Sequence, residues 1–215
     1  MNQRSAISKI KKNGILLVFP INNKKEPRSL WQEHFPRKKM VWKWDDESDN
    51  RVADLWHLMK KLSTCRQVVY SKWHQGRATF FSLDLFVALL CLSLNKHGEI
   101  QLSPTARILY DELVSNSPIS TKELKALTDL KGKFNEGVYN RGMKELFTRL
   151  LIVAYGEFAD GAFPSLGVGA TKHLFEDLWN EARAMQTDQA QKIINKYMPI
   201  DSAFRKYLKR TKLSL

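Results

Sequence analysis

The sequence predicts an α+β protein that is mainly α-helical and carries two β-hairpins. Most apolar side chains recur every three or four residues, as on amphipathic helices that pack one face against a core. Two pairs of short apolar runs, each joined by a turn that contains glycine, are typical of hairpins. With 215 residues, of which 43% are hydrophobic and 27% charged, the chain is long enough to bury a substantial core.

Residues 1–98 are expected to form a first α/β unit with a hairpin. A basic amphipathic helix ends at Gly14, and the buried strand that follows stops at Pro20. The elements predicted after this helix are a strand over 15–19, short helical turns over 29–35, a helix that includes 52–62, a hairpin from 67–73 and 78–81, and a helix over 83–94.

Residues 99–170 carry the clearest local signals. Ser103 can cap a helix that begins with Pro104, because proline at the first helical position loses no needed N–H. Ser120, followed three residues later by Glu123, is a capping box for a second helix. A third helix is expected over 135–150, followed by strands within 151–158 and 163–168. Three helices and a hairpin form the order of a winged helix-turn-helix unit, and a degenerate copy of it is one interpretation of the first unit.

Residues 171–215 are expected to form three C-terminal helices, over 171–185, 187–197 and 201–213, of which the last is strongly basic. The most apolar run, 80–94, is too short to span a membrane and is interrupted by Asp84. The two cysteines stand at no motif spacing, and no secretory signal is evident. These features favour a reducing, cytoplasmic location.

The net charge of +13 favours a polyanionic partner, with nucleic acid first and an anionic membrane surface second. Residues 1–100 hold 18 Lys and Arg against 9 Asp and Glu, residues 101–202 hold 12 against 13, and residues 203–215 hold 5 against none. The winged-helix unit is therefore not basic overall. We expect duplex DNA, contacted by several parts of the chain, and no membrane.

The third helix of the winged-helix unit carries the main candidates for DNA contact. Asn140, Arg141 and Lys144 lie opposite its apolar stripe. In a winged helix this element enters the major groove, where Arg and Asn can reach base edges and Lys can pair with phosphates. An ordinary solvated helix face is the alternative. Further candidates, in the turn before this helix, in the first hairpin and in the last helix, are Lys131, Lys133, Lys72, Arg77, Arg205, Lys206, Lys209 and Arg210. The turn 159–162 holds no Lys or Arg, which counts against phosphate contact by this wing.

The sequence contains none of the motifs of nucleotide-binding, serine-hydrolase or zinc-protease sites, and its five histidines are scattered. The acidic run 45–49 precedes a helix, where carboxylates complement the positive end of the helix dipole. No His or Cys stands beside this run at ligand spacing. We therefore expect neither a metal nor a cofactor.

Several segments together indicate a family. They are 102–107 (LSPTAR), 117–124 (SPISTKEL), 144–146 (KEL), 152–157 (IVAYGE) and, in the first hairpin, 70–72 (YSK) and 76–82 (GRATFFS). Over about residues 10–185 the chain resembles the AlkZ/YcaQ-related winged-helix proteins, in particular the short AlkZ-related members. The resemblance implies tandem winged helices, a DNA partner and kinship with DNA glycosylases that excise alkylated or crosslinked bases.

The catalytic signature of that family is Gln-x-Gln or Gln-x-Asp after the first helix. The matching segment here is Leu17-Val18-Phe19, whose apolar side chains cannot position a water for attack on a glycosidic carbon. Gln189-Ala190-Gln191 spells the pattern, but on a C-terminal helix. The resemblance therefore predicts a DNA-binding protein related to alkylation-repair glycosylases that lacks their catalytic motif.

Two alternatives stay open. The first is a small DNA glycosylase acting on flipped, alkylated bases. It would need a polar residue in a cleft between the units, with Asp45, Asp46, Glu47 and Gln67 as candidates. The second is a non-enzymatic protein–protein interaction module, because a fold does not determine its function.

Overall fold

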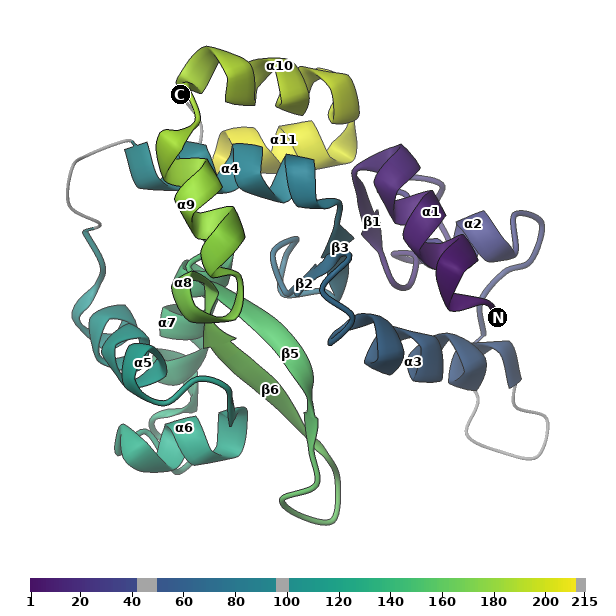
Figure 1. Cartoon of the computed structure of the whole chain (residues 1–215). Coiled ribbons are helices and arrows are strands. Elements are labelled where there is room, and N and C mark those ends of the chain that lie inside the picture. Colours follow the sequence, from purple (N-terminus) through teal and green to yellow (C-terminus); the bar gives the residue numbers. More distant parts are fainter. Residues whose placement is uncertain (42–49, 96–100, 212–215) are drawn as a thin grey trace.

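The computed structural model describes residues 1–41, 50–95 and 101–211, and it confirms the predicted α+β class (Figure 1). The helices are α1 (Gln3–Asn13), α2 (Leu30–His34), α3 (Asn50–Leu62), α4 (Leu83–Asn95), α5 (Pro104–Ser115), α6 (Thr121–Leu127), α7 (Glu136–Thr148), α8 (Thr171–Leu174), α9 (Glu176–Ala184), α10 (Thr187–Tyr197) and α11 (Ala203–Arg210). The strands are β1 (Ile15–Leu17), β2 (Val69–Ser71), β3 (Thr79–Phe81), β4 (Ile119–Ser120), β5 (Ile152–Phe158) and β6 (Ser165–Ala170).

The first and second parts of the chain have the same order of elements. The first runs α1, β1, α2, α3, β2, β3, and its sheet has the strand order β1-β3-β2. The second runs α5, β4, α6, α7, β5, β6, and its sheet has the strand order β4-β6-β5. Both sheets are antiparallel, with the last strand in the centre. This order is consistent with a winged helix in each part. The predicted boundary at residues 98–99 lies outside the described residues.

The two helix caps predicted at Ser103 and Ser120 are present in the structure. The Ser103 side chain accepts a hydrogen bond from the Ala106 N–H, and Pro104 begins α5. The Ser120 Oγ accepts from the Glu123 N–H at 3.0 Å, which caps α6. These bonds satisfy N–H groups that have no partner within the first helical turn.

The structure differs from the prediction at two places. Strand β4 was not predicted, since its two residues are too few to show a periodic pattern; they pair with Val168 and Gly167 of β6. The helix predicted over 171–185 is divided at Phe175, where the backbone leaves the helical conformation (φ −137°, ψ 57°) and the side chain is buried, 2% exposed. The Phe175 ring is buried in a core formed with α4 and the C-terminal helices. The local spacing of apolar residues does not reveal this contact, so it could not predict the break in the helix.

Two apolar cores run through the molecule. One contains residues of α1, α3 and the first sheet together with residues of α5, α7, β5 and β6. The other contains the opposite face of the first sheet, α4, and residues of α9, α10 and α11. In β3, Phe80 belongs to one core and Phe81 to the other, because successive strand residues point to opposite faces. The first sheet is thus covered on both faces by segments distant in sequence.

The C-terminal helices pack on the first unit. Helix α4 contacts α9 and α10. The Tyr197 ring at the end of α10 lies against Gly14, and its hydroxyl donates to the Asp84 Oδ2 at 2.7 Å. Helix α11 covers the first hairpin, with the Tyr207 ring 4.9 Å from that of Trp73. The hairpin β2–β3 therefore lies between α11 and β5 and does not project into solvent (Figure 1).

Candidate nucleic-acid interface

Helix α7 has one buried and one exposed side. Tyr139, Met143 and Leu146 are buried at four- and three-residue spacing, so they fix this side against the core. Asn140, Arg141 and Lys144 are exposed, as the sequence predicts. Thr148, further along the same side, is half-buried.

Close packing against α5 sets the orientation of α7. A Cβ atom at Gly142 would come within 2.7 Å of the Leu109 Cδ1 and 3.1 Å of the Thr105 Cγ2, both on α5. The missing side chain lets the two helices approach closely, and the exposed residues of α7 are directed away from this contact.

The charges around α7 leave its exposed side positive. Glu136, in the first turn, accepts from the Lys125 Nζ at 2.6 Å and from the Asn140 amide at 3.3 Å. The hydrogen bond from Lys125 lowers the pKa of Glu136, so this carboxylate remains ionised and paired. Within the described ranges, no acidic side chain forms an ion pair with Arg141 or Lys144.

The loop before α7 is exposed and carries an aromatic side chain that sequence reasoning missed. Lys131 and Lys133 are exposed, as a phosphate contact requires, and Phe134 beside them is 101% exposed. Phe163, in the turn of the β5–β6 hairpin, is 85% exposed. In the sequence, the position of Phe134 and Phe163 within otherwise polar turns was the signal that could have predicted their exposure. Such side chains can contact bases through their rings.

The wing formed by β5 and β6 acquires a cation from another element. The turn 159–162 contains no Lys or Arg, but the Lys122 Nζ of α6 donates to the Asp160 carbonyl oxygen at 2.5 Å. Lys122 is exposed. The cation beside the wing therefore comes from a residue 38 positions earlier in the chain, and its charge also acts on the Asp160 carboxylate of the same turn.

The first hairpin is less accessible than its sequence suggests. Arg77 is exposed, whereas Lys72 is half-buried, and burial lowers the pKa of its amine. His74, in the turn between the strands, is only 3% exposed and lies 5.2 Å from the Phe204 ring and 4.6 Å from the Tyr207 ring of α11. His74 is therefore not accessible for contact with a nucleic acid at this hairpin.

The environment of His74 predicts a pH dependence of stability. Burial, assisted by the charge of Arg77, lowers the pKa of His74 to about 4 from an ordinary 6.5. Between these values the unfolded chain binds a proton that the folded chain does not, so stability falls as the pH falls through this window. At pH 5 the loss relative to pH 7 is about 2 kcal/mol.

We expect the His74→Phe variant, whose ring suits the aromatic surroundings, to lose this component. Urea unfolding at pH 7 and pH 5 measures it as the difference between the two free energies of unfolding. The exposed His57 of α3 provides the control variant, His57→Gln, which should retain the wild-type difference. An unchanged difference in His74→Phe would show that folding does not lower the pKa of His74.

The cations of the last helix lie apart from α7. Lys206, Lys209 and Arg210 are exposed and Arg205 is half-buried, while Phe204 and Leu208 are buried. Helix α11 lies beside α4 and α10, away from α7 (Figure 1). The structure therefore does not gather the predicted contact residues into one cluster.

The segment Leu17-Val18-Phe19, which the resemblance predicts to stand at the family's catalytic position, lies in the core. Leu17 and Val18 are 0% exposed, and the Phe19 side chain packs against core residues. Gln67, a candidate for the glycosylase alternative, is exposed between α3 and β2. Asp45, Asp46 and Glu47 lie outside the described residues.

Among the described residues, no group of three or more His, Cys, Asp or Glu side chains is placed so that it could hold a metal ion. Across the same residues, every helix is too short or too polar to cross a lipid bilayer.

The fold is that of an α+β protein in which two parts of the chain have the same order of elements, and the third helix of the second part exposes Arg141 and Lys144. A family model described as AlkZ related matches residues 1–210, and the chain belongs to this family. The match extends the resemblance found over about residues 10–185 to nearly the whole chain. Comparisons with curated proteins and with solved structures gave no match.

Proposed function

We propose that this AlkZ-related protein binds duplex DNA through the exposed side of α7 and the loop before it, and that it does so without excising bases. The supporting observation is the pair Arg141 and Lys144, which are exposed and for which the described residues supply no ion-pair partner. Membership of a family related to DNA-repair glycosylases supports DNA as the polyanion.

In this proposal α7 lies in the major groove. Arg141 and Asn140 face base edges, because guanidinium and amide groups match their donor and acceptor patterns. Lys144, Lys131 and Lys133 pair with phosphates and set the position of the helix. Lys122, beside the wing, contacts the next phosphates along the backbone.

The burial of Leu17 and Val18 supports binding without catalysis. Both side chains are apolar and 0% exposed at the position where the family signature requires polar groups. A base or a water held at this position would have no hydrogen-bonding side chain from this segment.

An anisotropy titration on duplex, single-stranded and alkylated duplex DNA at 50 and 200 mM salt tests this proposal. With about five phosphates neutralised, duplex affinity should fall roughly 500-fold between the two salt concentrations. The same samples are analysed for abasic sites, and none are expected. Abasic sites in the alkylated duplex would support the glycosylase alternative, whereas affinity below the non-specific range at 50 mM would favour an interaction module.

A further inference from the structure

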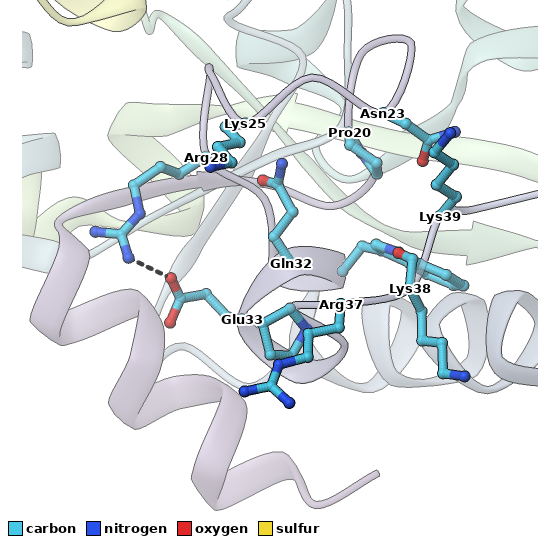
Figure 2. A pocket seen from close by; sticks show the side chains of 11 residues that line it. Pro20, Asn23, Lys25, Arg28, Gln32, Glu33, Arg37, Lys38 and Lys39 are labelled. Atoms are coloured by element: carbon cyan, nitrogen blue, oxygen red, sulfur yellow. Dashed lines mark hydrogen bonds and ion pairs between the residues drawn. The ribbon is translucent and has the colours of Figure 1, made fainter.

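A second basic surface lies in the first unit, outside the set of contact residues predicted from the sequence. The loop after β1 and the loop after α2 enclose a hollow of about 540 Å³ that is open to solvent (Figure 2). Its basic residues are Lys25, Arg28, Arg37, Lys38 and Lys39. Among the described residues that line it, Glu33 is the one carboxylate, and its Oε1 lies 2.6 Å from the Arg28 guanidinium. Four of the five cations that line the hollow therefore have no counter-charge from the other residues of its lining.

Side chains of α2 and of the preceding loop hold the two loops together. The Asn23 amide donates to the Met40 carbonyl at 2.9 Å and accepts from the Met40 N–H at 2.7 Å. The Gln32 amide donates to the Lys24 carbonyl at 2.6 Å. The indole N–H of Trp31, a residue that is 0% exposed, donates to the Lys38 carbonyl at 2.9 Å. The backbone that carries the cations is thus fixed before any ligand arrives, which reduces the entropy lost on binding.

The chemistry of the hollow suits phosphate groups of a chain better than an enclosed small molecule. Small-molecule sites are mostly apolar and bury most of their ligand. Here the lining is basic and open, and Figure 2 shows the Lys and Arg side chains around Gln32. Several Lys and Arg side chains spread around the hollow can each contact a different phosphate oxygen along a phosphodiester backbone.

The repeated element order gives this hollow a counterpart. The loop between α2 and α3 that carries Arg37, Lys38 and Lys39 corresponds to the loop between α6 and α7 that carries Lys131 and Lys133. Helix α3 differs from α7 in contacting the other part of the chain: it packs against β5, where the Lys60 Nζ lies 3.5 Å from the Glu157 Oε2. The first unit therefore retains the basic loop while its third helix packs against the second unit.

We propose that the hollow is a second phosphate-binding site and that it holds backbone phosphates of the DNA bound by α7. This inference rests on the proposed function. In it, α7 reads the groove and the hollow adds contacts that are independent of base sequence.

The test uses the full chain carrying Arg37→Gln, Lys38→Gln and Lys39→Gln together. These changes keep the Lys38 carbonyl that Trp31 uses, so the fold should persist and the thermal midpoint should match the wild type. Duplex affinity at 50 mM salt should fall roughly tenfold or more, and the slope of log K against log salt should decrease by about 2. The control removes the same charge from exposed Lys61, Arg183 and Lys192 and should change affinity less than twofold. An equal loss in both variants would overturn the proposal.

A second measurement on the unaltered protein remains informative if the triple variant is unstable. Bound duplex should protect Lys38 and Lys39 from acetylation, relative to Lys61 and Lys192; equal reactivity of the four lysines would contradict the site. Pyrophosphate is titrated in parallel, with the Trp31 indole N–H resonance as the reporter. A shift with pyrophosphate and no protection by DNA would identify a site for free phosphates and would also overturn the proposal.

A double variant of α7, Arg141→Gln with Lys144→Gln, distinguishes a failure of this inference from a failure of the proposed function. If the hollow binds phosphates but α7 does not read DNA, only the triple variant loses affinity. If α7 binds DNA and the hollow does not, only the α7 variant loses affinity. Losses in both variants, each with its own decrease in salt slope, support both proposals.

Discussion

Replacing Arg141 and Lys144 of α7 by glutamine is expected to weaken duplex binding on the order of 10- to 100-fold at 50 mM salt. Both side chains are exposed and carry no ion pair within the described residues, so their removal costs the folded protein little. Glutamine is a good helix former and preserves α7. An arginine that contacts a base and a lysine that contacts a phosphate contribute about 1–3 kcal/mol and about one unit of salt slope respectively.

The same anisotropy titration measures the effect, and Arg183→Gln with Lys192→Gln is the control. These two exposed residues lie on α9 and α10, so the variant has the same net charge as the α7 variant. A loss confined to the α7 variant supports a localised interface. Unchanged affinity in the α7 variant would show that the third helix is not the reader.

Replacing Gly167 by alanine is expected to destabilise the protein by about 3 kcal/mol, the size typical of severe overpacking. Gly167 lies in β6, the central strand of the second sheet, opposite Ser120 of β4. A Cβ atom there would stand 2.2 Å from the Tyr155 carbonyl oxygen and 2.7 Å from the Phe158 Cε2. The neighbouring backbone cannot move away easily, because β6 is hydrogen-bonded on both sides.

Thermal unfolding followed by circular dichroism should show a midpoint lowered by roughly 6–12 °C for a chain of this size. Gly161→Ala, in the turn of the same hairpin, is the control: its nearest contact would be the Lys122 Nζ at 3.4 Å. The control should lie within about 0.5 kcal/mol of the wild type. A Gly167→Ala protein with the wild-type midpoint would contradict the close approach of β5 to β6 at its register shift between Ala154 and Glu157.

The elements that the sequence predicts correctly have local causes. The caps at Ser103 and Ser120 use a side chain and an N–H three residues away, and the buried side of α7 follows from residues three and four apart. The first hairpin follows from two apolar runs around Gly76. The elements that were missed depend on distant partners: β4 exists because β6 pairs with it, and the break at Phe175 accompanies burial of that ring.

The candidate site divides in the same way. The exposure of Asn140, Arg141 and Lys144 could be predicted, because helical spacing alone places them on the side of the helix away from its apolar stripe. The cation beside the wing, Lys122, could not, since its contact with the Asp160 carbonyl joins residues 38 positions apart. The burial of His74 could not either, because α11 is far away in sequence.

The α+β class, the two hairpins, the basic side of α7 and the family can be predicted from short-range patterns in the amino-acid sequence. The tertiary structure adds which cations are accessible and which charges have partners. It brought Asn23 to Met40 and thereby formed the basic hollow, and it placed α11 over the first hairpin. Exposure and electrostatic pairing depend on distances through space, which the identity of neighbouring residues in the sequence does not specify.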